Sequence, residues 1–149
     1  MERLKVKTAV FMILEREGKI LFLQRYNTGY YDGLYSLPSG HVEAGEFPLD
    51  TAVRELEEEV NVIVKKEDLQ LVHMTFEKNI YIDFYFVAKS WENEPKIGEV
   101  DRCSDLKWID LLKEKPDIII EKVYNALSSY KKGILYSEFE EEELEKRIH

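Results

Sequence analysis

Three glutamates near the end of an expected helix have the spacing of a metal-binding group. Glu55, Glu58 and Glu59 are separated by helical intervals, and measured from Leu49 they point roughly 240°, 180° and 280° around the axis, on one face. Each like-charge pair at this spacing destabilises a helix by about 0.2–0.5 kcal/mol, and a helix C-terminus disfavours anions further. A divalent cation such as Mg2+, which prefers carboxylate oxygens, would turn this repulsion into attraction.

A solvated acidic face is the alternative interpretation of these glutamates. Exposed helices often carry runs of Glu, and a second run spans residues 138–145 of this chain. The glutamates alone do not decide between the two interpretations. Their surroundings favour the metal site, because a glycine-rich approach and a single arginine stand at fixed distances from them.

Residues 40–62 resemble the Nudix box. That pattern is Gly, five residues, Glu, seven residues, then Arg-Glu-aliphatic-x-Glu-Glu-x-Gly-aliphatic. It is matched in type and spacing by Gly40, Glu46, Arg54, Glu55, Leu56, Glu58, Glu59 and Val62. Asn61 stands where the pattern has Gly, but Asn is the next most tolerant of positive φ, so the helix stop is expected to survive. Residues 28–41 look like the entry loop of the nucleoside-triphosphate-cleaving branch.

The resemblance implies a role for each matching residue. The metal ligands would be the side chains of Glu55, Glu58 and Glu59, with the backbone carbonyl of Gly40 as a possible fourth. Gly40 would also lie against the substrate. Arg54 would pair with a nearby glutamate and orient it, and Glu46 fits that structural network better than the metal. An ordinary surface pair between Arg54 and Glu58 is the alternative for the arginine.

A glutamate outside the box often completes the site in this family, from a loop after the central strands. Glu99 is the candidate, because Gly98 would let that loop approach closely. An exposed loop carboxylate is the alternative, and three neighbours compete for the role: Glu92, Glu94 and Asp101. The carboxylate that accepts the proton of the attacking water is expected among three, in the order Glu58, Glu55 and Glu99.

Arg25 and Tyr30 are candidate substrate contacts. Arg25 ends an expected strand and could bind a phosphate through its forked donors, or it could be a solvated strand-end charge. Tyr30 shares its loop with Tyr26, Tyr31 and Tyr35. These rings could stack on a base or pack the loop against the sheet.

Strands and two helices must hold these residues in place. Strands are expected at 6–14, 20–24, 69–76, 80–88 and 106–109, with a short one near 35–37 inside a long loop, and turns at 17–19 and 78–79. Pro48 suits the first position of a helix that ends at Val60, and a second helix is expected over 116–130. This mixture predicts an α/β class, and the resemblance implies a Nudix-type α/β/α sandwich with a mixed β-sheet.

Composition limits the classes of function. The 149 residues suit one domain spanning 1–149, with a charged C-terminal tail over 138–149 that is expected to be a solvated helix or partly frayed. A net charge of −9 argues against duplex nucleic acid as a partner. The single cysteine, Cys103, excludes a disulfide framework and a zinc cluster. No signal peptide or membrane span is recognisable, so a cytoplasmic location is expected, with monomer or homodimer left open.

The expected function is hydrolysis of a diphosphate linkage in a small nucleotide. The resemblance implies a Mg2+-dependent enzyme, with Mn2+ as the other candidate ion, that converts a nucleoside triphosphate or related derivative to a nucleoside monophosphate and pyrophosphate. The alternatives are an ADP-ribose or nucleotide-sugar pyrophosphatase and a non-catalytic nucleotide sensor. The complete set of box glutamates favours an enzyme over a sensor.

Overall fold

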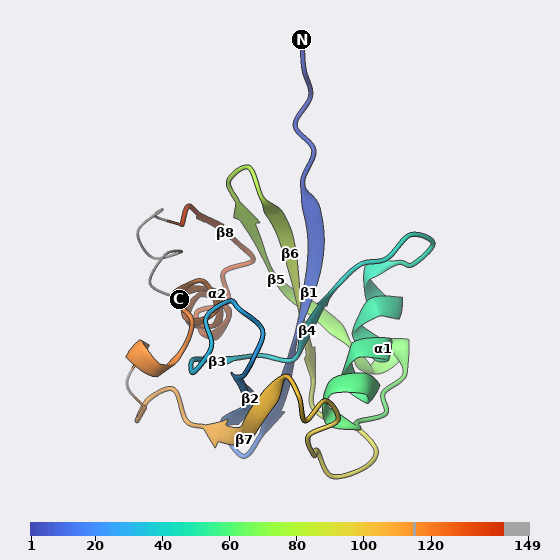
Figure 1. Ribbon diagram of the computed structural model, residues 1–149, viewed down its shortest axis with the longest axis vertical. Coiled ribbons are helices and arrows are strands. Elements are labelled where there is room, and N and C mark those ends of the chain that lie inside the picture. The colour runs from blue at the N-terminus through green and yellow to red at the C-terminus, as the bar shows by residue number, and fades with distance from the viewer. Residues whose placement is uncertain (115, 142–149) are drawn as a thin grey trace.

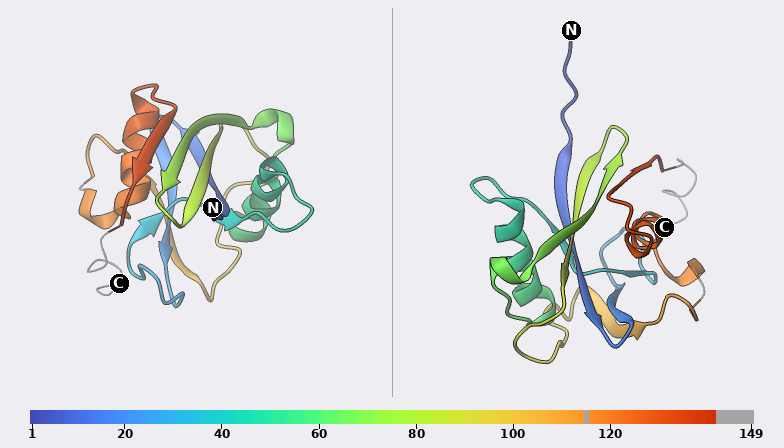
Figure 2. Two further views of the ribbon diagram at one scale, coloured as in Figure 1. Left: turned by 90° about the horizontal axis from the view of Figure 1, so that it is seen from above. Right: turned by 180° about the vertical axis from the view of Figure 1, so that it is seen from behind.

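Two helices cover opposite faces of one mixed sheet. The structure is a computed structural model that describes residues 1–114 and 116–141. Helix α1 (Pro48–Val60) lies on one side of the sheet and helix α2 (Glu121–Lys131) on the other, in all the views of Figures 1 and 2. The predicted α/β/α sandwich with a mixed sheet is therefore confirmed.

The sheet is built around a parallel pair of strands from distant parts of the chain. Among the described residues its order is β3-β2-β1-β6-β5-β8, with β4 paired to β1 and β7 to β2. The pairs β1–β6 and β5–β8 are parallel, and the others are antiparallel. The strands are β1 (Lys7–Arg16), β2 (Lys19–Arg25), β3 (Tyr35–Ser36), β4 (Ser39–His41), β5 (Gln70–Glu77), β6 (Tyr81–Ala88), β7 (Cys103–Ile109) and β8 (Tyr136–Phe139).

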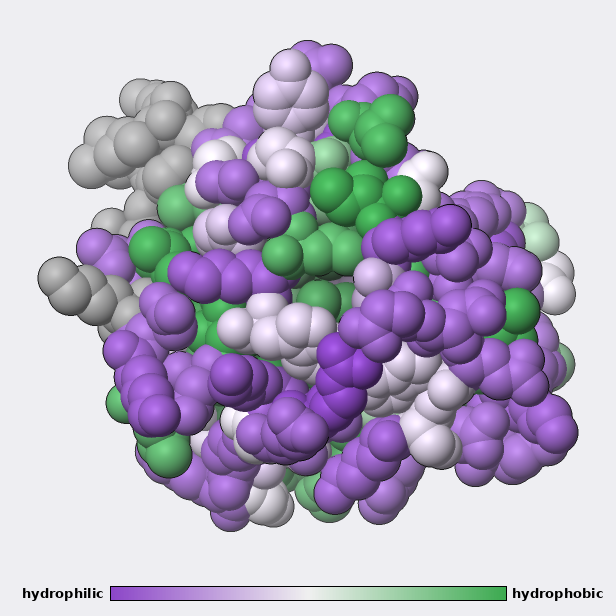
Figure 3. Space-filling view, turned by 90° about the horizontal axis from the view of Figure 1, so that it is seen from below, coloured by the Kyte–Doolittle hydropathy of each residue, from purple (hydrophilic) through white to green (hydrophobic). Residues whose placement is uncertain are grey.

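Strand β1 is apolar along both faces because both are covered by a helix. Phe11 and Ile13 belong to the hydrophobic cluster under α2. Val10 and Met12 belong to the cluster under α1, together with Leu56 of that helix. Hydrophilic residues cover most of the molecular face seen in Figure 3, with hydrophobic residues in small separate groups.

Helix α1 begins and ends at the predicted residues. Pro48 occupies the first turn, and the Asp50 carboxylate accepts the Phe47 N–H at 2.9 Å, which satisfies one free helix donor without a side-chain cap at Phe47. Asn61 closes the helix in the left-handed conformation, with φ 59° and ψ 31°. Asn61 thus ends the helix in the conformation expected of the glycine that the Nudix pattern has at this position.

Helix α2 starts later than predicted. The sequence predicts one helix over 116–130, but a 3-10 turn (Pro116–Ile118) is followed by extended backbone at Ile120, with φ −54° and ψ 129°, before α2 begins at Glu121. The reason is a tertiary contact, because the Ile120 N–H donates to the Tyr35 carbonyl at 3.0 Å. Periodicity along the sequence cannot report this bond.

Two short strands were not predicted, and both shape the cavity described below. Strand β4 pairs with β1, which places Gly40 opposite Val10. Strand β8 pairs with β5 in parallel, so Glu138 and Phe139 lie in the sheet. The prediction of a solvated helix or a partly frayed tail is wrong for these two residues, because they form a strand, and residues 142–149 of that tail lie outside the described residues. No helix in the described part of the chain is long and apolar enough to cross a membrane.

Candidate active site

Glu55 and Glu59 form a pair of neighbouring carboxyl groups on the inner side of α1. The two carboxyl groups interact directly, and Glu59 Oε1 accepts the Ser39 N–H at 3.0 Å. Burial raises the pKa of both carboxyls, and the charge of Glu55 raises the pKa of Glu59 further. Two such groups are stable together only if they retain a proton or receive a cation.

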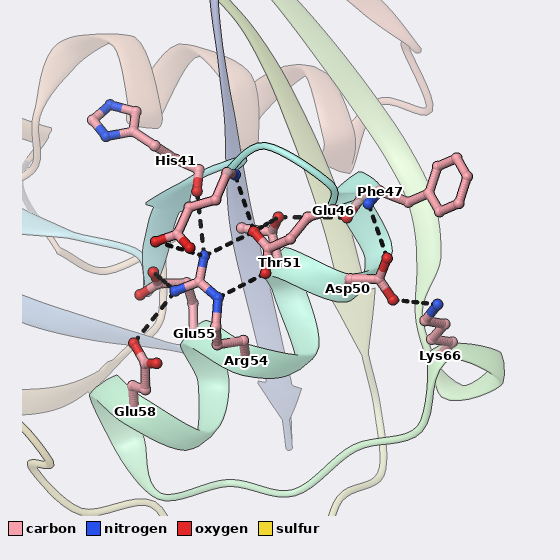
Figure 4. A network of polar contacts seen from close by, with 10 residues as sticks. His41, Glu46, Phe47, Asp50, Thr51, Arg54, Glu55, Glu58 and Lys66 are labelled. Atoms are coloured by element: carbon pink, nitrogen blue, oxygen red, sulfur yellow. Dashed lines mark hydrogen bonds and ion pairs between the residues drawn. The ribbon is translucent and has the colours of Figure 1, made fainter.

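The forked side chain of Arg54 joins Glu55 of this pair to Glu46 (Figure 4). Its Nε and Nη2 donate to the two oxygens of Glu46 at 2.8 and 3.0 Å, and its Nη1 donates to Glu55 at 2.8 Å. The contact with Glu58 is longer, at 3.4 Å. The arginine lowers the pKa of Glu46 to about 2. Arg54 therefore lies in the Glu46 network expected from the resemblance, and the surface pair with Glu58 is the weaker contact.

Glu46 is itself fixed in orientation by its own loop and helix. Its Oε1 accepts the Thr51 hydroxyl at 2.9 Å and the Glu43 N–H at 3.0 Å. With both Arg54 bonds added, the oxygens of Glu46 are used within the protein. This agrees with a structural rather than a metal-binding role for Glu46.

Glu58 and Glu99 complete the acidic wall from different elements. Glu58 is half exposed, with 49% of its side chain accessible. Glu99 lines the same cavity from the loop before β7. That loop packs tightly on α1, because the Gly98 N–H donates to the Glu59 carbonyl at 2.8 Å and a Cβ on Gly98 would collide with the Glu58 carbonyl oxygen. The expected close approach at Gly98 is therefore observed.

Gly40 is the second point where only glycine fits. A Cβ at Gly40 would overlap the side chain of Glu55, so this glycine lets β4 lie directly over the carboxyl pair. The next residue, His41, is hydrogen-bonded through Nε2 to the Tyr81 hydroxyl at 2.7 Å. Burial lowers the pKa of His41. His41 and Tyr81 thus connect the carboxylates to the far end of the cavity.

The Arg25 guanidinium is engaged within the protein. Its Nε donates to the Tyr30 carbonyl at 2.6 Å and its Nη2 to the Thr28 hydroxyl at 3.1 Å. Arg25 still lines the cavity, but these bonds show it bracing the loop that carries Tyr30. Asp32 closes the same loop by accepting the Gly29 N–H at 2.9 Å.

The loop tyrosines divide between packing and exposure. Tyr31 is buried in the core under α2, and the Tyr35 hydroxyl donates to Asp105 at 2.7 Å. Tyr26 is exposed. Tyr30 lines the cavity, packs edge-on against Tyr31 and donates its hydroxyl to Glu141 at 2.9 Å. Tyr31 also borders the cavity but is buried, so Tyr30 is the exposed ring of the cavity wall and stays the candidate substrate contact.

Arg102 is a cavity residue that the sequence reasoning missed. It lines the cavity beside Glu99, and within the described residues its guanidinium has no hydrogen bond or ion pair. Its backbone N–H donates to the Glu99 carbonyl at 3.0 Å, which ties its position to the acidic wall. The sequence offered one signal for this role, because Arg102 follows the candidate glutamate, Glu99, by three residues.

A second polar group lies at the far end of the cavity and was also missed. Lys122 Nζ is 2.7 Å from Glu77 and 2.9 Å from Asp83. Asp83 is fully buried, because α2 covers the face of β6 from which it projects. The alternation of Tyr81, Asp83 and Tyr85 along the strand was visible in the sequence, but the cover over them was not.

One cavity of about 410 Å3 joins the two polar groups. This volume is within the range of small-molecule sites, roughly 300–1,000 Å3. The acidic wall comes from α1 and the loop before β7. The far end comes from the last residue of β5, the first residues of β6 and the first turn of α2.

The acidic wall suits a hard divalent cation in its donor set. Glu55, Glu58, Glu59 and Glu99 offer carboxylate oxygens, which Mg2+ and Mn2+ accept. Across the described residues, no three acidic, His or Cys side chains already converge into a metal-binding arrangement. The fit rests on Glu59, because a half-buried carboxyl beside a second carboxyl is stabilised by added positive charge.

The comparisons with known proteins define the class. The family profile described as NUDIX domain matches residues 3–125, and the chain therefore belongs to the NUDIX domain family. This confirms the resemblance seen in residues 40–62. In fold, the chain is similar to a NUDIX hydrolase from Nitrosomonas europaea, with a TM-score of 0.78, 21% identity, and coverage of 94% of this chain and 82% of that one.

Two curated relatives show the closer sequence similarity. A probable DHNTP pyrophosphohydrolase from Lactococcus lactis subsp. cremoris is 34% identical over 57% of this chain and 55% of its own length. An ADP-ribose pyrophosphatase from Methanocaldococcus jannaschii is 32% identical over 69% of this chain and 61% of its own length. The chain thus spans little more than half the length of these relatives.

Proposed function

We propose that the chain is a divalent-metal-dependent pyrophosphohydrolase. Its substrate is a nucleoside triphosphate or a related nucleoside diphosphate derivative, and a triphosphate yields a nucleoside monophosphate and pyrophosphate. The observation that carries the proposal is the half-buried Glu55–Glu59 carboxyl pair on the wall of a nucleotide-sized cavity, with Glu58 and Glu99 beside it. Membership of the NUDIX domain family supports the same chemistry.

Each residue of the wall has a part in the proposed reaction. Glu55, Glu58 and Glu59 would hold Mg2+ or Mn2+, with the Gly40 carbonyl as a further ligand. The ion would neutralise phosphate oxygens and acidify a water molecule. Arg54, held by Glu46, orients Glu55.

Glu58 is the first candidate to accept the proton of the attacking water. It is half exposed and its contact with Arg54 is long, at 3.4 Å, so its carboxylate is less committed to the protein than that of Glu55. Glu55 is second, because it lies on the same helix but is bonded to Arg54 at 2.8 Å, and Glu99 is third, because it lies on the loop before β7 and not on α1. Arg102, without a partner among the described residues, is proposed as a phosphate contact.

ADP-ribose is the second candidate substrate. The observation in its favour is the relative from Methanocaldococcus jannaschii, which bears the name ADP-ribose pyrophosphatase and is 32% identical. We further propose that residues 1–149 act as one catalytic domain in the cytoplasm, as a monomer or homodimer, without a role for duplex nucleic acid. The net charge of −9 supports the last point.

A nucleotide panel tests the proposed function. The purified chain is incubated with the common nucleoside triphosphates, an oxidised guanine triphosphate and ADP-ribose, with Mg2+ or Mn2+, and the products are separated and identified. We expect a nucleoside monophosphate and pyrophosphate from at least one triphosphate, and no turnover after metal is removed by chelation.

Two variants on the same helix make this experiment specific. Glu58→Gln should lower kcat by about 10²–10⁴-fold, because it removes a proton acceptor and a negative ligand. Glu57→Gln, next to it on the exposed side of α1, is the matched control and should keep wild-type activity. Equal activity of wild type and Glu58→Gln would exclude the proposed mechanism.

A further inference from the structure

The far end of the cavity holds more hydrogen-bonding capacity than the protein uses. The carboxylates of Glu77 and Asp83 are 3% and 0% exposed, and Lys122 is 15% exposed. One lysine therefore stands against two buried carboxylates. Burying such an excess of acceptors is costly unless further donors arrive.

Two of these groups have unfilled positions. Asp83 Oδ1 has no hydrogen-bond partner among the residues that the structure describes, and Oδ2 has only the ion pair with Lys122. The Lys122 ammonium has three protons, of which two point to Glu77 and Asp83. It is also the most exposed of the three groups. The cluster can thus donate one hydrogen bond to a bound molecule and accept at least two.

The walls around this cluster are aromatic. Lys122 Nζ lies 5.5 Å from the centre of the Phe11 ring and 5.1 Å from that of Tyr81, and Phe139 of β8 lines the same cavity. A cavity with aromatic walls and a few directed polar groups favours a flat heterocycle over a sugar or a flexible chain.

Matching donors to acceptors selects the heterocycle. An edge that fills one donor and two acceptors must present one carbonyl and two N–H groups. Guanine does so, with its carbonyl, ring N–H and 2-amino group, whereas adenine presents one amino donor and uracil and cytosine present two acceptors each. With the other bases, a buried carboxylate would be left unpaired or would face a carbonyl, and such mismatches are the strongest source of discrimination.

We propose that Lys122, Asp83 and Glu77 form a subsite that selects a 2-amino-4-oxopyrimidine edge, as found in guanine and in pterins. The proposal rests on the proposed function, because it names the base of the nucleotide whose phosphates lie at the acidic wall. It assigns specificity to the far end, and catalysis remains with α1.

Three triphosphates that differ at this edge test the wild-type protein. GTP presents the full edge, ITP lacks only the 2-amino group, and ATP replaces the carbonyl and ring N–H. We expect kcat/KM to fall at least about 10-fold from GTP to ITP and further to ATP, since a site built to bind a polar group strongly rejects its absence. Equal kcat/KM for GTP and ATP would overturn the subsite while leaving the hydrolase intact.

Two variants separate recognition from support of the fold. Asp83→Asn and Lys122→Met keep the approximate shape of the side chains and change their hydrogen bonding. We expect each to reduce the GTP-to-ATP ratio of kcat/KM at least about 10-fold. A structural ion network would instead lower activity with all three substrates by the same factor, and that outcome would overturn the proposal.

Lys131→Met is the matched control on the same helix. Lys131 also pairs with a carboxylate, Glu15 at 3.0 Å, but it lies outside the cavity. The GTP-to-ATP ratio of kcat/KM for Lys131→Met should therefore stay at the wild-type value. If Asp83→Asn and Lys122→Met do not fold, the wild-type ratios still decide. Binding of guanosine, inosine and adenosine without metal, measured by calorimetry, decides the proposal even if no nucleotide is hydrolysed. Equal affinities for the three nucleosides would then refute it.

Discussion

At the scale of single residues, the site is a set of charges fixed by a few strong contacts. Arg54 bonds both oxygens of Glu46 and one of Glu55, so its position is determined from two directions. Paired N–H···O contacts of this kind are about twice as strong as neutral hydrogen bonds. A lysine in place of Arg54 could not make both contacts at once.

Arg102 provides a test at the same scale. Arg102→Ala should raise KM for a nucleoside triphosphate about 10-fold with little change in kcat, because it removes a phosphate contact but none of the carboxylates proposed to hold the metal or accept the proton. Steady-state kinetics measure the two constants separately. Arg3→Ala, in the segment before β1, is the control and should change neither. A loss confined to kcat would contradict the role of a phosphate contact.

The sequence could identify the residues of the acidic wall but not those of the far end. Glu55, Glu58 and Glu59 are recognisable because their spacing is local and their mutual repulsion is conspicuous on one helix. Asp83 and Lys122 are 39 residues apart in sequence and meet only because α2 folds over β6. Their chemistry is a property of the sandwich, and no local pattern encodes it.

At the scale of elements, helix α1 depends on the left-handed residue that ends it. Asn61→Ala should reduce the free energy of unfolding by about 1 kcal/mol, since alanine tolerates a φ of 59° less well than asparagine. Asn61→Gly should leave stability within about 0.5 kcal/mol of wild type or raise it. Urea denaturation measures both.

A second asparagine supplies the comparison for that prediction. Asn125 is exposed in the middle of α2, and Asn125→Ala should stabilise the protein slightly, because alanine is the better helix former. A similar loss of stability at positions 61 and 125 would show that the left-handed conformation is not the cause.

The two helices show why local and tertiary signals differ in value. Pro48 and Asn61 mark the ends of α1 within the sequence itself, and both ends were predicted correctly. The start of α2 is set by the bond from Ile120 to Tyr35, and strand β4 exists because β1 offers it an edge. Such elements depend on partners that periodicity does not register.

At the scale of the whole molecule, the carboxyl pair should couple stability to pH and to metal. The pKa of Glu59 lies well above its ordinary value of 4.5 in the folded protein, so folding retains a proton that the unfolded chain releases. Its contribution to stability is complete below that value and is lost as the pH rises through the folded-state pKa. The metal-free protein should therefore lose stability at Glu59 as the pH rises above about 5.

Thermal unfolding with and without Mg2+ measures this coupling. We expect Mg2+ to raise Tm by a few degrees near pH 8 and by less near pH 5, because the ion replaces the missing proton. Glu59→Gln should remove most of the pH dependence and the Mg2+ effect, and Glu57→Gln should preserve both. An equal Mg2+ effect in Glu59→Gln would show that the ion binds elsewhere.

The parallel pairing of β1 with β6 has a consequence for biosynthesis. Residues 7–14 bond along one edge to residues 81–88, so that edge has no native partner until the ribosome has added more than seventy further residues. At roughly 5–20 residues per second, this interval lasts several seconds. During it, one of the most apolar segments of the nascent chain is open to chaperones, and slow translation of this gene would lengthen the interval.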